Sequence, residues 1–235
     1  PVWVIGKSYS FTFQFKVDST APTMNNVSTS STGKYTNSST YVSASDSMSG
    51  VECIYMKTPG SSSYGNMGTS TTVSSSGMNG LYSFYAKDKA GNTSRTYFLY
   101  LDTVKPTGKI KNSNGTEITG SYTNQTFSYS ATDSGSGISY LQYKKPSSSS
   151  WLTYTSGTSI SASAASGTYQ FRAVDKAGNI SATKSITLDS SKPTMTLYSG
   201  DVSVSNGFKS IANYIKATAT DSGSGVKTIY VKKPG

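Results

Sequence analysis

Histidine is absent from the 235 residues, and cysteine occurs once, as Cys53. The lack of histidine excludes Ser-His-Asp and Cys-His catalysis and removes the commonest transition-metal ligand. A single cysteine excludes an internal disulfide, so each domain has to be held together by its core. Charged residues make up 14% of the chain, against about 25% in typical globular proteins. The sequence is therefore poor in the residues from which enzyme sites are built.

Long apolar runs and amphipathic helix patterns are also missing. No run approaches the ~18 residues that cross a membrane, so we expect no membrane span in this segment. The chain opens with PVWVIGKSYS, which lacks the charged start and apolar core of a signal peptide. We therefore expect an internal piece of a longer protein.

Serine and threonine, by contrast, account for 78 residues, 47 and 31 respectively. Together with Val, Ile and Tyr, the threonines favour strands, while Ser, Gly and Asn favour turns. The composition therefore predicts an all-β protein.

The net charge is +10, but the lysines are scattered, and the longest runs are the doublets at 144–145 and 232–233. Nucleic-acid binders concentrate their charge on one patch or helix, so we expect no nucleic-acid partner. Lysines on strand edges deter aggregation. A weak affinity for anionic surface polymers is the alternative reading.

A repeat of about 87 residues organises the chain. The heptad ATDSGSG occurs at 131–137 and again at 219–225, and ASDSMSG stands at 44–50. Residues 46–102 align with 133–189 without a gap, and 25 of the 57 aligned positions are identical. This period is too long for a solenoid unit and suits one small β-sandwich of about 100 residues.

Each repeat begins with a short link that contains proline: DSTAPT, DTVKPT or DSSKPT. Proline fixes φ and stiffens such a link. The links predict immunoglobulin-like domains at 18–101 and 102–188, and the first half of a further domain at 189–235. Residues 1–17 are expected to be the last strand of a preceding repeat or an N-terminal extension.

Turn residues and aromatic spacing refine this prediction. The heptad supplies an Asp that can cap backbone N–H groups and a Gly that can take φ > 0, which predicts a turn between strands. The sequence DKAGN predicts a hairpin turn with Gly91 or Gly178 in the left-handed region. Tyr82 and Tyr169 each precede a core Phe by two residues, as in a tyrosine corner. We therefore expect tandem immunoglobulin-like sandwiches of about seven strands, without disulfides.

These motifs, D-[ST]-x-x-P-T, A-[ST]-D-x-x-S-G-[VI] and Y-x-F-x-A-x-D-K-A-G-N, resemble the tandem Ig-like repeats of bacterial secreted and cell-surface proteins, especially those of Gram-positive bacteria. The resemblance covers nearly the whole chain. It implies modules that serve as stalks, spacers or adhesive arms, or that stand beside catalytic domains of wall- or glycan-degrading enzymes. It implies no catalytic residues.

The positions of the acidic residues also indicate a non-catalytic protein, because eight of the eleven occupy repeated turn or link positions. A glycosidase needs two carboxylates across one cleft. We therefore expect no enzyme activity, and no catalytic, cofactor-binding or metal-binding residues. Calcium is an alternative to ordinary Asx-turns, held by Asp102 with Asp46 or Asp88, or by Asp189 with Asp133 or Asp175. A Lys–Asn crosslink is another alternative.

Aromatic residues at one equivalent position suggest where a ligand could bind. Trp151 aligns with Tyr64 in a serine-rich loop. These two residues are either packing anchors or a ligand platform.

The sequence as a whole predicts a non-catalytic spacer of an extracellular bacterial protein, either a semi-rigid stalk or a surface-layer element. The alternatives are a module that binds glycan or host protein directly through Trp151 and Tyr64, and accessory domains of a secreted hydrolase. Expected partners are cell-wall or surface polymers, glycans or other surface proteins. A further alternative is head-to-tail self-assembly, in which the N-terminal strand of one molecule completes the C-terminal half-domain of another.

Overall fold

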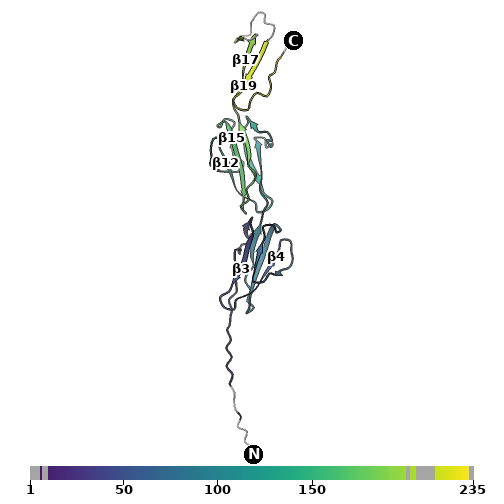
Figure 1. The fold of residues 1–235 in the computed structure, drawn as a ribbon, viewed down its shortest axis with the longest axis vertical. Coiled ribbons are helices and arrows are strands. Elements are labelled where there is room, and N and C mark those ends of the chain that lie inside the picture. Colours follow the sequence, from purple (N-terminus) through teal and green to yellow (C-terminus); the bar gives the residue numbers. More distant parts are fainter. Residues whose placement is uncertain (1–5, 7–9, 200–201, 205–214, 233–235) are drawn as a thin grey trace, which may run out of the picture. The chain divides into compact units, whose positions relative to one another are not determined.

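The computed structural model describes residue 6 and residues 10–199, 202–204 and 215–232. This described part contains strands and turns and no helix, which confirms the predicted all-β class (Figure 1). The chain divides into two compact units, unit 1 (Pro1–Thr103) and unit 2 (Val104–Gly235).

Unit 1 is a sandwich of two sheets with strand orders β1-β3-β6 and β2-β8-β7-β4-β5. Its eight strands are β1 (Thr23–Asn25), β2 (Lys34–Thr36), β3 (Thr40–Ser45), β4 (Val51–Lys57), β5 (Gly65–Asn66), β6 (Ser70–Val73), β7 (Gly80–Asp88) and β8 (Tyr97–Leu101). Neighbouring strands are antiparallel, except that β2 runs parallel to β8.

The core of unit 1 lies between these two sheets because alternate residues of each strand point inward. On β7, Tyr82, Phe84 and Ala86 are buried, while Leu81 and Tyr85 face outward and are partly exposed. The buried apolar residues of this core are Met24, Val42, Ile54, Val73, Tyr82, Phe84, Ala86, Leu99 and Leu101.

Unit 2 repeats this architecture with sheets β14-β11-β9 and β10-β16-β15-β12-β13. Its strands are β9 (Thr107–Asn112), β10 (Tyr122–Thr123), β11 (Phe127–Thr132), β12 (Ile138–Lys144), β13 (Leu152–Tyr154), β14 (Ser159–Ile160), β15 (Gly167–Asp175) and β16 (Lys184–Leu188). The predicted immunoglobulin-like sandwich is therefore present twice. Each copy has eight strands, one more than expected, because the short strands β2 and β10 each pair parallel with the last strand.

The tyrosine corner is present in both sandwiches. The hydroxyl of Tyr82 donates to the carbonyl of Met78 at 2.9 Å, and that of Tyr169 donates to the carbonyl of Ala165 at 3.0 Å. The bond ties the loop before each long strand to the strand itself. This outcome confirms the prediction made from the spacing of tyrosine and phenylalanine.

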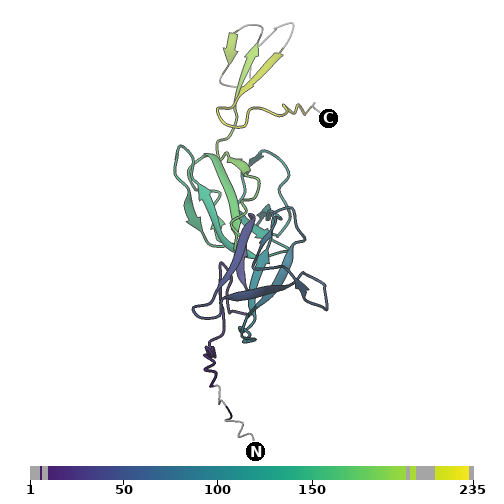
Figure 2. The same cartoon turned by 60° about the horizontal axis from the view of Figure 1, so that its bottom comes forward.

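Unit 2 also contains a third sheet, β18-β17-β19, made of β17 (Thr194–Ser199), β18 (Val202–Val204) and β19 (Ile215–Thr220). Residues 226–232 follow this sheet in the chain and carry no strand, and Figure 2 draws them as a trace that leaves the base of the sheet. Leu197 and Ile215 align with Ile110 and Phe127 of the second sandwich, which are buried. In the third sheet these two positions are 39% and 80% exposed, because no second layer covers them in the described structure.

Residues 10–17 carry no strand, and their alternating apolar side chains Phe11, Phe13, Phe15 and Val17 are 77–86% exposed. The domain boundaries at 18–101, 102–188 and 189–235, and the strand role of residues 1–17, stay predictions.

Candidate functional site

The repeated heptad forms the same turn three times. The Oδ1 atom of Asp46 accepts hydrogen bonds from the N–H groups of Met48 and Gly50 at 3.1 and 2.9 Å. Asp133 and Asp221 make the equivalent pairs of bonds at 2.8–3.0 Å. The last glycine of each heptad has φ between 78° and 81°, where a side chain would be strained. The heptad is therefore a backbone turn, as predicted.

The DKAGN turn lies beside the heptad within each sandwich. Asp88 accepts hydrogen bonds from the backbone N–H and the side-chain amide of Asn92, both at 2.8 Å. Gly91 has φ of 98°. The N–H of Lys89 donates to the carbonyl of Gly50 at 3.0 Å, which joins this turn to the heptad. The predicted hairpin turn with a left-handed glycine is confirmed, and unit 2 repeats it at 175–179.

The aspartates of two links, Asp18 and Asp189, each clamp the heptad of the module that follows them. Asp18 accepts hydrogen bonds from Thr20 through Oδ1, from its N–H at 2.9 Å and its hydroxyl at 2.7 Å, and from the N–H of Ser49 through Oδ2 at 3.0 Å. These bonds from Ser49 and Thr20 hold the pKa of the Asp18 carboxyl well below its usual value. Asp189 has the same environment, formed by Ser191 and Ser224, and its pKa is lowered in the same way.

Three carboxylates of unit 1 therefore converge. Oxygen atoms of Asp18, Asp46 and Asp88 lie within 4.8 Å of one another. Such a group could hold a cation, but calcium takes six to eight oxygens. Each carboxylate already accepts hydrogen bonds from turn residues, which accounts for its position without an ion. Together the carboxylates repel one another electrostatically.

The calcium pairs considered as an alternative in the sequence are wrong in their choice of link aspartate. Asp46 and Asp88 are joined by Asp18, the link that precedes their domain, and not by Asp102, which follows it. Asp189 likewise bonds to Ser224 of the following heptad and not to a turn of the preceding domain. The reason is that the link aspartate caps the turn of the module that it introduces.

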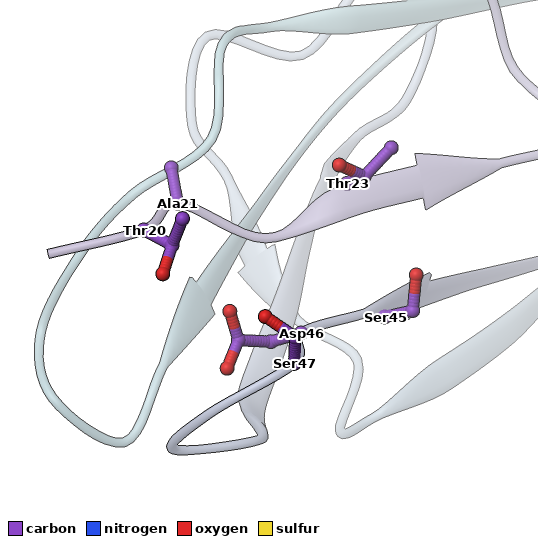
Figure 3. A pocket seen from close by; sticks show the side chains of 6 residues that line it. All are labelled: Thr20, Ala21, Thr23, Ser45, Asp46 and Ser47. Atoms are coloured by element: carbon purple, nitrogen blue, oxygen red, sulfur yellow. The ribbon is translucent and has the colours of Figure 1, made fainter. Parts of the chain in front are cut away.

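A shallow pocket of about 310 Å³ lies next to this cluster. Figure 3 shows its lining, with Thr20 and Ala21 from the link, Thr23 from β1, Ser45 from β3, and Asp46 and Ser47 from the heptad. Its hydroxyl groups face no histidine, because the sequence contains none. The pocket therefore lacks the base that would activate a serine or threonine nucleophile in a Ser-His site.

The two aromatic residues singled out in the sequence lie in different units and pack in related ways. The ring of Tyr64 meets Tyr85 edge-on with centroids 4.9 Å apart. Trp151 has the guanidinium carbon of Arg172 at 4.2 Å and the ammonium of Lys144 at 4.9 Å from its ring centroid. Because Arg172 aligns with Tyr85, each aromatic packs on the same outward position of the long strand. Whether either residue binds a ligand stays a prediction.

Cys53 is buried and unpaired by any disulfide. Its thiol lies 2.6 Å from the side-chain oxygen of Asn66. The aligned residue in unit 2 is Tyr140, which is 46% exposed. The repeat therefore folds without a thiol at this position.

Comparisons with known proteins do not assign this chain to a family. No family model and no curated protein match the chain. Among solved structures, the fibronectin(III)-like modules of Clostridium thermocellum CbhA align with a TM-score of 0.34 and 16% identity, over 71% of this chain and 92% of that chain. A TM-score of this size does not define a shared fold, so the fold assignment rests on the strand orders and registers above. Within the described residues, no helix is long and apolar enough to cross a membrane.

Proposed function

We propose that this chain is a non-catalytic structural segment of a bacterial secreted or cell-surface protein. Its consecutive Ig-like modules form a semi-rigid stalk or surface-layer element that supports adhesion or display outside the cell. Its partners in this role are cell-wall polymers, glycans or other surface proteins.

The proposal is carried by the double anchoring of the link residue Asp189. Its backbone N–H donates to the carbonyl of Thr123 in the second sandwich at 2.9 Å. Its side-chain Oδ2 accepts from the N–H of Ser224, in the heptad beyond the link, at 2.6 Å. One residue is thus fixed to both sides of a junction that also contains Pro193. Such a junction restricts bending more than a Gly/Ser tether does, which suits a stalk.

The use of the acidic residues supports a structural role. Asp18, Asp46, Asp88, Asp133 and Asp175 all accept hydrogen bonds that close turns or links. A carboxylate engaged in this way in every repeat serves the fold of each module. A general acid or base would instead be needed once, opposite a substrate.

Small-angle X-ray scattering of the whole chain tests the stalk. We expect a narrow distribution of intramolecular distances for the wild-type protein and a broader one for Asp189→Ala, which loses the bond to Ser224. Glu117→Ala is the control, because it removes only a surface ion pair with Lys109. A wild-type distribution as broad as that of Asp189→Ala would refute the stalk.

A further inference from the structure

The outer face of the larger sheet in unit 1 is covered with aromatic rings. We call this surface the tyrosine face; it consists of Tyr35 on β2, Phe98 and Tyr100 on β8, Tyr85 on β7, Tyr55 on β4 and Tyr64 just before β5. All six side chains are partly exposed, so they lie outside the buried core of the sandwich.

Strand register brings these rings into contact. Tyr55 and Tyr85 are direct cross-strand partners, and their rings stack with centroids 4.8 Å apart and planes 10° apart. Tyr64 adds its edge-on contact with Tyr85. Toward the opposite edge of the sheet, Tyr35 on β2 pairs with Tyr100 on β8, with ring centroids 5.5 Å apart. The face therefore runs across the sheet, from β2 to the residue before β5.

The second sandwich shows that the fold does not require four of these six rings, whereas aromatic residues recur at the positions of Tyr35 and Tyr64, as Tyr122 and Trp151. The residues of unit 2 that occupy the positions of Tyr55 and Tyr85 are Gln142 and Arg172, which are also cross-strand partners. Their side chains make a hydrogen bond of 2.8 Å in place of the stacked rings. Phe98 and Tyr100 are likewise replaced by serine and threonine, at 185 and 187. Because the polar face is compatible with the same sandwich, the aromatic face of unit 1 calls for an explanation other than folding.

The charges near the face indicate the chemistry of its partner. Lys87 is paired with Glu52 at 2.9 Å, and the ammonium of Lys57 lies 5.4 Å from the centroid of the Tyr64 ring. Lys87 thus has an acidic partner and Lys57 lies over a ring, while the six side chains that make up the face carry no charge themselves. The face offers ring faces and edges, phenolic hydroxyls and the exposed amide of Asn66. Aromatic surfaces with polar tips suit a partner that presents both C–H groups and hydroxyls.

We propose that the tyrosine face of unit 1 is a docking surface for an uncharged polysaccharide. Sugar C–H faces pack on the tyrosine rings, while sugar hydroxyls bond to the phenols and to Asn66. An open sheet face that several strands build accommodates an extended polymer rather than a small molecule that needs enclosure. This binding role deepens the proposed function, because it assigns a surface to the glycan partners named there. The stalk itself requires only the links, so the scattering test and the binding test can fail separately.

The test is affinity electrophoresis of the whole chain through gels that contain laminarin, xylan, galactomannan or dextran, with dextran sulfate as the anionic comparison. The key variant is Tyr55→Gln with Tyr85→Arg, which places the residue pair of unit 2 on unit 1. Because that pair already exists at these positions in a folded sandwich, the variant is expected to keep its thermal unfolding midpoint within a few degrees. Gln142→Ala, at the position of Tyr55 in unit 2, is the matched control.

We expect at least one neutral polysaccharide to retard the wild-type chain and the control equally. The double variant should bind it about tenfold or more weakly, since tyrosines at the centre of a contact dominate binding. Three results would overturn the proposal: no retardation by any of the neutral polymers, retardation by dextran sulfate alone, or retardation that the double variant retains. Binding of another protein through this face, without any response to the polysaccharides, would overturn it as well.

Discussion

The cores of the two sandwiches exchange a large and a small side chain at one pair of positions. In unit 2, a Cβ atom added to Gly108 would overlap the ring of Tyr129, which is fully buried. In unit 1 the aligned residues are Met24 and Val42, both buried. The large residue thus stands on the first strand in one sandwich and on its neighbour in the other. We predict that the two positions are energetically coupled.

The magnitudes follow from the packing. Gly108→Met alone places a long side chain where the Tyr129 ring lies, and such overpacking costs about 1–3 kcal/mol of unfolding free energy. Tyr129→Val alone leaves a cavity beside Phe171, whose ring stacks on Tyr129 at 5.1 Å. We expect a loss of about 2–4 kcal/mol, somewhat below the 3–5 kcal/mol typical of Phe→Ala, since Val refills part of the space. The double variant reproduces the pair of unit 1 and should lose less than about 1.5 kcal/mol, as volume-conserving exchanges do.

Urea unfolding monitored by tryptophan fluorescence measures these values. The chain has two tryptophans, Trp3 and Trp151, so Trp3→Phe in every variant leaves Trp151 as a reporter of unit 2. The double-mutant cycle should give a coupling energy of about 2 kcal/mol or more in favour of the double variant. Additivity of the two single losses to within about 0.5 kcal/mol would refute the reasoning.

Three further predictions concern the turns and corners. Tyr82→Phe and Tyr169→Phe each leave a loop carbonyl without its hydrogen-bond donor, so each should lower the unfolding free energy of its own unit by about 1–3 kcal/mol. Calorimetry of the whole chain measures this loss, and unchanged unfolding midpoints would contradict the tyrosine corner. Asp18 has a lowered pKa, so its ionised form stabilises the fold above about pH 4, and this stability is lost as the pH falls below that value. In the Asp18→Asn variant, the stability of unit 1 should therefore fall less steeply with decreasing pH. An unchanged dependence on acid pH would be evidence against the clamp. Asp46→Asn keeps the Oδ1 acceptor for Met48 and Gly50 and removes one of three negative charges that lie within 4.8 Å of one another. In buffer with EDTA, this variant should raise the melting temperature of unit 1, because it relieves the repulsion between the carboxylates. A lower melting temperature would show that this repulsion does not limit the stability of unit 1.

The turns could be predicted from the sequence because their hydrogen bonds are local. The bonds of Asp46 to Met48 and Gly50 span two and four residues, and the bond of the Tyr82 hydroxyl to Met78 also spans four. Motifs of this length contain both partners, so their residue types and spacing are sufficient. The same holds for the inward alternation of Tyr82, Phe84 and Ala86 on β7, which reflects the two-residue period of a strand.

The link aspartate was misassigned because its partner is distant. Asp18 bonds to Ser49, 31 residues away, and nothing in the linear order says whether a link belongs to the module before or after it. The repeat itself could not decide this, since the same motif recurs on both sides of every module.

The sequence by itself determined the all-β class, the period of the repeat and the places where the backbone turns, because these depend on residue types within a few positions of one another. Only the tertiary structure decided which side chains share a surface or a space in the core. The tyrosine face requires the register that sets Tyr55 opposite Tyr85, and the exchange of Gly108 and Tyr129 for Met24 and Val42 requires two strands to lie side by side. Strand register is chosen by the burial of a whole apolar face, which is a property of the packed sandwich and not of any one segment.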